Sequence, residues 1–243
     1  MRKINLLAER DFENRKASGE PVRWKQSKFY WATNNSIEEH KGATNFAIKD
    51  KHVLEIGCAS GNDASSYCQH AASYVGIDIS DVAISNCQNL QLKNATFHCV
   101  DGHILPLQDG TVDFVIVNSL LHHLDLRTVF KEIARVLKND GSLIFREPLG
   151  TNFIFQFYRL ITPSARTVDE RPFTFSDIKL LEEYFIIDNV NWFGFISLLS
   201  AFVRLETLRR YLTEIDRILS KTPMKYCFWQ ISGIVKLRSK MPH

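Results

Sequence analysis

The sequence predicts an α/β protein built on a doubly wound, mostly parallel sheet with helices on both faces. Short apolar runs alternate with helical stretches between residues 50 and 147, which is typical of β-α-β units. Two further runs near the C-terminus complete a seven-stranded sheet whose last strand is antiparallel. The seven expected strands are 53–56, 74–77, 96–100, 112–117, 142–145, 188–195 and 226–237.

Helices are expected between these strands. Apolar residues recur at helical spacing over 126–138, and this helix is expected to stop at Asn139-Asp140-Gly141. Ser176-Asp177 is a candidate N-cap for a helix over 176–184, whereas 148–175 is expected to be a loop with one helical turn. The other expected helices are 62–71, 80–91 and a helical insertion, one helix or a pair, over 196–219.

Three regions follow from this pattern: an N-terminal lid or cap (1–49), the α/β core (50–147), and an acceptor-side region of the same domain (148–243). The net charge of +3 provides no broad electrostatic footprint for nucleic acid. Five cysteines without CxxC spacing favour a reducing cytoplasm. The start of the chain lacks the apolar core of a signal peptide, and no apolar run has the length of a spanning helix.

A glycine-containing loop, Glu55-Ile56-Gly57-Cys58-Ala59-Ser60-Gly61, follows the first expected strand and opens a helix. Glycine lets the backbone turn sharply and lie close to a ligand. Ala59 and Asn62 stand where the second and third glycines of a dinucleotide-binding motif belong, and the loop has no Lys-Ser/Thr pair. Both the dinucleotide and the P-loop interpretations are therefore weakened.

Two carboxylates follow the next two strands. Asp78 could accept hydrogen bonds from both hydroxyls of a ribose, or it could belong to a helix N-cap with Ser80. Asp101-Gly102 could accept from an adenine amino group, with Ile79 on one side of the ring, or it could simply form a turn.

Together these segments resemble the Rossmann-like (class I) S-adenosylmethionine-dependent methyltransferases, and most of all their small-molecule branch with the ubiquinone and menaquinone methyltransferases. The resemblance covers residues 50–147 and rests on the order of the motifs. Ala59 departs from it, because the family usually has glycine there. The segments that carry it are 53–61, Gly76-Ile77-Asp78, Val100-Asp101-Gly102, Pro106-Leu107, Asp113-Phe114-Val115, 118–124 and the Leu-Lys-Asn-Asp-Gly-Ser turn.

The resemblance implies S-adenosylmethionine as the cofactor and in-line methyl transfer as the reaction. Glu55 would fix the loop or engage the amino group of the methionine part, while Asp78 would hold the ribose and Asp101 the adenine. Tyr30, within Phe29-Tyr30-Trp31, could close over the cofactor as a lid or serve as a core anchor. The expected cofactor-binding residues are Tyr30, Glu55, Gly57, Cys58, Ala59, Gly61, Asp78, Ile79, Asp101, Gly102 and Asn118.

Methyl transfer needs few catalytic side chains, because positioning of the reactants supplies most of the rate enhancement. A general base is needed only where the acceptor loses a proton. His122, His123 and Glu147 are the candidate catalytic residues, with structural packing as the alternative. No metal is expected, since no Cys, His and Asp residues cluster at ligand spacing.

The expected acceptor is a small, partly apolar molecule. Phe153, Phe155, Phe157 and Tyr158 could line its pocket or pack normally, and Arg159, Arg166 and Arg171 could meet an anionic acceptor. RNA or protein methylation and a cofactor-binding, non-catalytic module are the alternatives. No nucleic-acid partner is expected; peripheral membrane contact through 196–219 is possible, and the chain is expected to be a monomer or homodimer.

Overall fold

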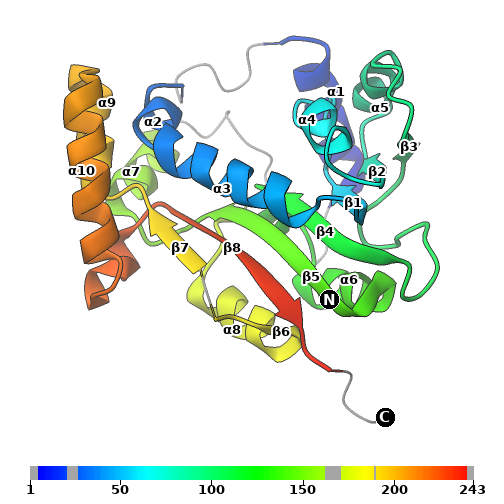
Figure 1. Cartoon of the computed structure of the whole chain (residues 1–243). Coiled ribbons are helices and arrows are strands. Elements are labelled where there is room, and N and C mark those ends of the chain that lie inside the picture. Colours follow the sequence, from blue (N-terminus) through cyan, green and yellow to red (C-terminus); the bar gives the residue numbers. More distant parts are fainter. Residues whose placement is uncertain (1–4, 21–26, 162–170, 189, 240–243) are drawn as a thin grey trace.

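The computed structural model describes residues 5–20, 27–161, 171–188 and 190–239. Within this part of the chain, eight strands form one sheet in the order β3-β2-β1-β4-β5-β8-β6, with β7 also paired to β8 (Figure 1). Neighbours among β1 to β5 are parallel, and β8 runs antiparallel to β5. The strands are β1 (His52–Ile56), β2 (Ser73–Asp78), β3 (Ala95–Cys99), β4 (Val112–Asn118), β5 (Leu137–Pro148), β6 (Phe185–Ile186), β7 (Val190–Phe193) and β8 (Gln230–Leu237).

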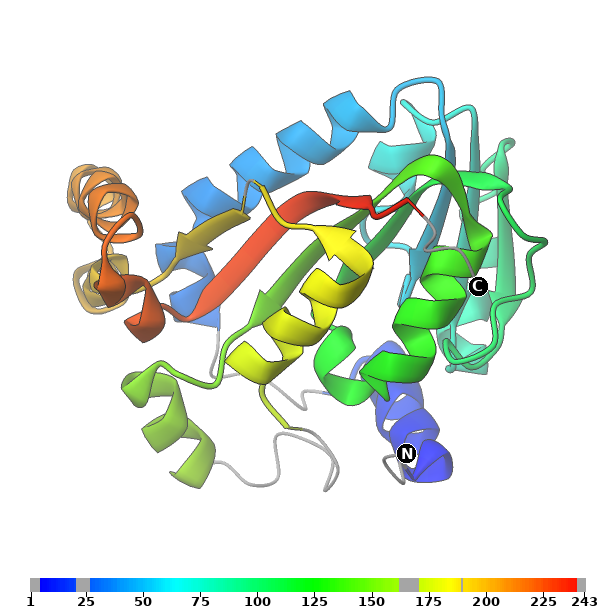
Figure 2. The same cartoon turned by 90° about the horizontal axis from the view of Figure 1, so that it is seen from below.

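Helices cover both faces of the sheet, as the sequence predicts (Figures 1 and 2). Successive strand residues point to opposite faces, so Val53 packs with α4 (Ala64–Cys68) and the end of α3 (Asn34–Ala47), while Leu54 packs with α6 (Leu126–Val136). The second face is also covered by α8 (Phe175–Tyr184), and α5 (Asp81–Gln88) lies against β2 and β3. The predicted doubly wound α/β architecture is confirmed.

The two flanking regions meet beyond the β8 side of the sheet. There α2 (Ser27–Ala32) packs against α7 (Phe153–Ile161) and α9 (Ser200–Val203), with α10 (Glu206–Leu219) alongside. Phe155 stacks on Trp229 with ring centroids 4.0 Å apart, and Phe29 meets Phe155 edge-on at 5.1 Å. The insertion at 196–219 is therefore a helix pair, preceded by a short 3-10 turn, and it is anchored by aromatic packing.

Several expected boundaries are wrong. The helix expected to reach residue 138 ends at Val136, because Leu137 takes extended angles and pairs with Val112. Gly141 is not a helix cap but lies inside β5, where a Cβ would come within 3.0 Å of the Lys138 carbonyl. The strand expected over 188–195 is shorter, β7 at Val190–Phe193, and a separate strand, β6, precedes it at Phe185–Ile186; their registers on β8 differ by one residue.

Two corrections concern the acceptor-side region. Residues 148–175, expected to be mostly loop, contain the nine-residue helix α7. The N-cap of α8 is Thr174 rather than Ser176-Asp177, because the Thr174 and Asp177 side chains exchange hydrogen bonds with each other's backbone amides. Across the described residues, no helix combines the length and apolar character needed to cross a membrane.

Candidate functional site

A cavity of about 570 Å³ lies at the carboxyl ends of β1 to β5, roofed by α1 (Leu6–Ala17) and α2. This volume is typical of a site for a cofactor-sized molecule, and ligands of doubly wound sheets bind at this edge. Of the expected cofactor-binding residues, all but Gly61 line it: Tyr30, Glu55, Gly57, Cys58, Ala59, Asp78, Ile79, Asp101, Gly102 and Asn118. The fold therefore brings these expected residues together at one site. Which part of a cofactor each residue contacts remains a prediction.

The loop after β1 has a conformation that only small residues tolerate. Gly57 and Gly61 have φ near +77°, and a Cβ on Gly57 would come 2.7 Å from Leu120 Cδ2. Ala59 also lies in the left-handed region, at φ +47°, where an L residue with a Cβ is strained. The usual family glycine would avoid this strain, so Ala59 costs stability without closing the cavity.

The backbone amides of this loop are occupied within the protein. Gly57 and Cys58 both donate to the Ile77 carbonyl, and Gly61 donates to the Cys58 carbonyl. Ala59 donates to Asp78 Oδ2 at 2.9 Å. Pyrophosphate-binding loops present free amides to their ligand. These four amides are not available, and the structure therefore argues against a dinucleotide or nucleoside triphosphate in this loop.

Asp78 links the loop to the end of β2. Its two carboxylate oxygens accept from the amides of Ala59 and Ser80, each at 2.9 Å, while Ser80 itself caps α5 by accepting from Ala83. Burial raises the pKa of Asp78, and the two backbone bonds oppose that rise. The carboxylate still lines the cavity. It therefore holds the loop and keeps lone pairs for a ligand's hydroxyl groups.

His103, which the sequence analysis overlooked, fixes Asp101. Its Nδ1 lies 2.6 Å from Asp101 Oδ1, and its Nε2 accepts from the Asp125 amide, so the ring proton sits on Nδ1. Burial acts to raise the pKa of Asp101, but the hydrogen bonds from the His103 ring and amide leave it lowered. The second oxygen is left for an amine donor. In the sequence, the only indication of this contact was an acidic residue two positions before a histidine.

Glu55 is buried beneath the loop and accepts a hydrogen bond from the Tyr74 hydroxyl. Burial raises the pKa of Glu55 to about 8, a rise that the Tyr74 hydrogen bond opposes. The group is therefore mostly neutral at pH 7 in the absence of a ligand. A ligand ammonium group at the cavity surface would favour its ionised form.

Carboxyl groups dominate the charge of the cavity wall. Six of them line it, against the cations Lys16 and Arg146 and the imidazole of His123. A wall of this sign suits a cationic ligand and disfavours a polyphosphate. The six are Glu9, Glu13, Glu55, Asp63, Asp78 and Asp101. These carboxyl groups fit S-adenosylmethionine, which carries a sulfonium and an ammonium group.

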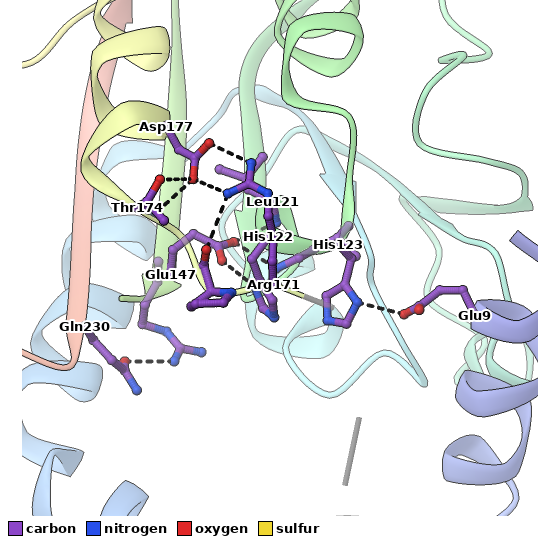
Figure 3. Close-up of polar contacts among 12 residues, drawn as sticks. Glu9, Leu121, His122, His123, Glu147, Arg171, Thr174, Asp177 and Gln230 are labelled. Atoms are coloured by element: carbon purple, nitrogen blue, oxygen red, sulfur yellow. Dashed lines mark hydrogen bonds and ion pairs between the residues drawn. The ribbon is translucent and has the colours of Figure 1, made fainter. Parts of the chain in front are cut away.

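The three expected catalytic residues make two separate contacts, Glu147 with His122 and His123 with Glu9 (Figure 3). Glu147 is fully buried, and it accepts from the amides of Leu120 and Leu121, both at 2.8 Å, and lies 2.6 Å from His122 Nδ1. Neither Glu147 nor His122 lines the cavity. Together they hold the turn after β4, where Ser119 has a left-handed φ of +55°.

His123 is the candidate whose side chain borders the cavity. Its Nδ1 lies 2.9 Å from Glu9 Oε1, and Figure 3 shows Glu9 reaching it from α1. The N-terminal helix is thus attached to the active-site turn by a buried contact. Arg10 and Asn14 add further attachments, to the Ile79 carbonyl and to Asp81. Residues 5–17 therefore form part of the site, which their polar composition did not indicate.

The expected lid and acceptor residues have mixed positions. In the lid motif, Phe29 is a buried anchor, whereas Tyr30 lines the cavity and packs against Trp229 at 5.2 Å. Phe155 is buried in the aromatic cluster, but Phe153 and Phe157 are exposed and are not part of the cavity wall. The side chains of Tyr158 and Arg159, like all of Arg166, lie outside the described residues.

Arg171 cannot take the anion-binding role considered for it. Its guanidinium bonds both oxygens of Asp177, at 2.5 and 2.7 Å, and it does not line the cavity. The same contact raises the pKa of Arg171. Arg146, an arginine that does line the cavity, lies on β5 and carried no motif that would single it out.

Comparison with known proteins agrees with this geometry. Residues 54–145 match the model of the methyltransferase domain family. The core of the chain resembles a methyltransferase domain. Ubiquinone biosynthesis O-methyltransferase of Coxiella burnetii is 31% identical over 119 residues, which cover 47% of this chain and 50% of that protein. The chain thus spans about half the length of the curated relatives that it matches.

Solved structures agree with the fold of the chain. YcgJ of Bacillus subtilis has a TM-score of 0.58 at 16% identity and covers 84% of this chain and 100% of that one. A SAM-dependent methyltransferase from Aquifex aeolicus has a TM-score of 0.53 at 14% identity and covers 97% and 100%. The expected resemblance to class I methyltransferases is confirmed.

Proposed function

We propose that this protein is an S-adenosylmethionine-dependent methyltransferase whose acceptor is a small, partly apolar molecule. The observation that carries the proposal is the cavity wall: Asp78 and Asp101 present carboxylate oxygens, the loop amides are occupied, and the net charge is negative. The methyltransferase family of the core and the ubiquinone O-methyltransferase relative support it.

Different residues of this chain would bind different parts of the cofactor. Asp101, oriented by His103, would accept from the adenine amine, and Asp78 would accept from the ribose hydroxyls. Gly57 would let the methionine part lie close to the loop, above Glu55. When bound, S-adenosylmethionine supplies an electrophilic methyl group: an acceptor lone pair bonds to the methyl carbon while the S–C pair stays on sulfur, and the acceptor's proton goes to a base or water.

His123 is the residue that we propose as that base. Its ring borders the cavity, and its Nδ1 lies 2.9 Å from Glu9 Oε1, a contact that holds the imidazole at the cavity wall. Glu147 and His122 are positioning residues, because they hold the turn that carries His123. Catalysis beyond this is positioning of the reactants in the cavity that α1 and α2 cover.

A calorimetric titration with S-adenosylhomocysteine tests the cofactor site. Asp78→Asn should weaken binding at least about tenfold, because two charge-assisted hydrogen bonds lose their charge. The control is Asp140→Asn, which makes the same chemical change at an exposed position of β5 and should leave binding unaltered. No binding to the unaltered protein at millimolar ligand would refute the proposal.

A second measurement separates an enzyme from a cofactor-binding module. Labelled S-adenosylmethionine is incubated with cell extract, and the fractions are sorted into lipid, small polar metabolite, RNA and protein. Label in a small-molecule fraction supports the proposed acceptor class, and His123→Asn should lower transfer without lowering cofactor affinity. Label confined to RNA or protein would contradict the acceptor class, and cofactor binding without any transfer would contradict the enzymatic claim.

A further inference from the structure

We propose that Arg146 is the receptor for an oxyanion, a carboxylate or a phosphate, carried by the methyl acceptor. The proposal rests on the proposed function above and deepens it by naming the chemical class of the acceptor. Arg146 lies near the end of β5, is half-buried, and lines the same cavity as the cofactor residues.

The sheet order places Arg146 at the acceptor end. Asp101, Asp78 and Gly57 follow β3, β2 and β1 in turn, and β4 and β5 come next in the sheet. Arg146 is the register partner of Asn118 on β4. Neighbouring strands are about 4.8 Å apart, so Arg146 lies roughly 10 Å beyond the β1 loop. With the adenosine over β2 and β3 and the methionine part over β1, the β4–β5 end is left for the acceptor.

The charge of Arg146 is not compensated within the described residues. Its guanidinium donates to the neutral side chain of Gln230 at 3.3 Å, and no described carboxylate comes within ion-pair distance of it. Two of the wall carboxylates have other partners: Glu9 lies against His123, and Asp63 pairs with Lys41 at 2.5 Å. Arg146 is therefore a half-buried cation of the cavity wall that pairs with none of the six wall carboxyl groups and is available to a ligand.

Other arginines of the chain show the contrast. Those on α6, before α8 and on α10 have carboxylate partners within 2.8 Å: Arg135, Arg171, Arg209 and Arg217. These pairs stabilise local structure. Arg146 instead has the amide of Gln230, which is buried on β8 and can orient the guanidinium without neutralising it.

One titratable neighbour of the guanidinium is neutral. His40 of α3 lies nearby, and its pKa falls to about 4, first because of burial and then because of the Arg146 charge, against the effect of the Asn118 amide. His40 is therefore uncharged at pH 7. The guanidinium offers five N–H donors in a planar fork that matches a carboxylate or a phosphate. Ser27 and Tyr30 of α2 line the same cavity and add polar and aromatic contacts to this cationic one.

The experiment compares matched probes on protein saturated with S-adenosylhomocysteine. Benzoate and phenyl phosphate carry the oxyanion, and benzamide is the neutral partner of benzoate. Ligand-observed NMR and calorimetry should show both anions binding at least about tenfold more tightly than benzamide. Arg146→Gln should remove this preference, and Arg146→Lys should retain part of it. Arg127→Gln, an exposed arginine on α6, is the control and should change nothing.

Four results would overturn the proposal. The first is that neither anion binds, and the second is that benzamide binds as well as benzoate to the unaltered protein. The third is that the preference for the anions survives in Arg146→Gln, and the fourth concerns the cofactor. The variant weakens S-adenosylhomocysteine but not 5′-methylthioadenosine, which lacks the carboxylate; Arg146 would then bind the cofactor. In each case S-adenosylhomocysteine still binds the unaltered protein, so the proposed function stands. Failure of that binding would refute both.

Discussion

Replacing Glu147 by glutamine should destabilise the protein by about 2–4 kcal/mol. The carboxylate makes three contacts from a fully buried position: two with backbone amides at 2.8 Å and one with His122 at 2.6 Å. Glutamine keeps one oxygen for the amides but turns charge-assisted bonds into neutral ones, which loses about 1 kcal/mol each. Its amide nitrogen then faces His122, and the third contact must be rebuilt with the other imidazole tautomer.

Unfolding in urea, followed by circular dichroism, measures this loss. Glu183→Gln is the matched control, because Glu183 is exposed on α8 and lies 3.6 Å from Arg127 in a surface pair worth less than about 1 kcal/mol. Because Leu120 both donates to Glu147 and closes against Gly57, the Glu147 variant should also weaken S-adenosylhomocysteine binding several-fold. A Glu147→Gln protein as stable as the control would refute the positioning role assigned to this carboxylate.

Three further predictions concern the cofactor side. Ala59→Gly should raise the free energy of unfolding by about 0.5–1 kcal/mol, because relief of left-handed strain exceeds the added chain entropy. The thermal midpoint of the ligand-free protein should fall between pH 6.5 and 8, because folding raises the pKa of Glu55 from 4.5 to about 8 and the stabilisation present below pH 4.5 is lost as the pH rises through 8. Below pH 6.5 the lowered pKa of His40 acts in the opposite direction, since folding favours its neutral form. His103→Ala should weaken S-adenosylhomocysteine binding about fivefold in calorimetry, since Asp101 loses its fixed orientation.

Each of these has its own control. Ala83→Gly, within α5, should lower the free energy of unfolding by about 1 kcal/mol, opposite in sign to Ala59→Gly. Glu55→Gln should flatten the decline in thermal midpoint, and an unchanged pH profile in that variant would show that another group titrates. His98→Ala, on the exposed side of β3, should leave cofactor affinity unaltered; an equal loss in both variants would argue against the His103–Asp101 contact.

The sequence predicts the core well because its signals are local. Each strand of the core is a short apolar run, and Asp78 and Asp101 directly follow such runs, so the parallel topology alone brings them to one edge. Position 57 has a positive φ, which favours glycine, so the residue type itself indicates this backbone conformation. Such features need no knowledge of distant contacts.

The rest depends on long-range packing. Glu9 meets His123 across 114 positions of the chain, and no pattern in 1–49 indicates that contact. Glu147 was expected at the reaction because it ends a core strand, yet it points to the turn amides instead of the cavity. Arg146, its neighbour, points the other way, as alternation along a strand requires. Only the arrangement of β4, β5 and β8 decides which of the two reaches a ligand.

A crystal structure of the protein with S-adenosylhomocysteine bound is the most direct test of the central claim. We predict the adenine amine at Asp101, the ribose hydroxyls at Asp78, and the sulfur beside Gly57 with the Arg146 end of the cavity open. A ligand bound elsewhere, or lying in this cavity with its adenine at Arg146, would contradict the account.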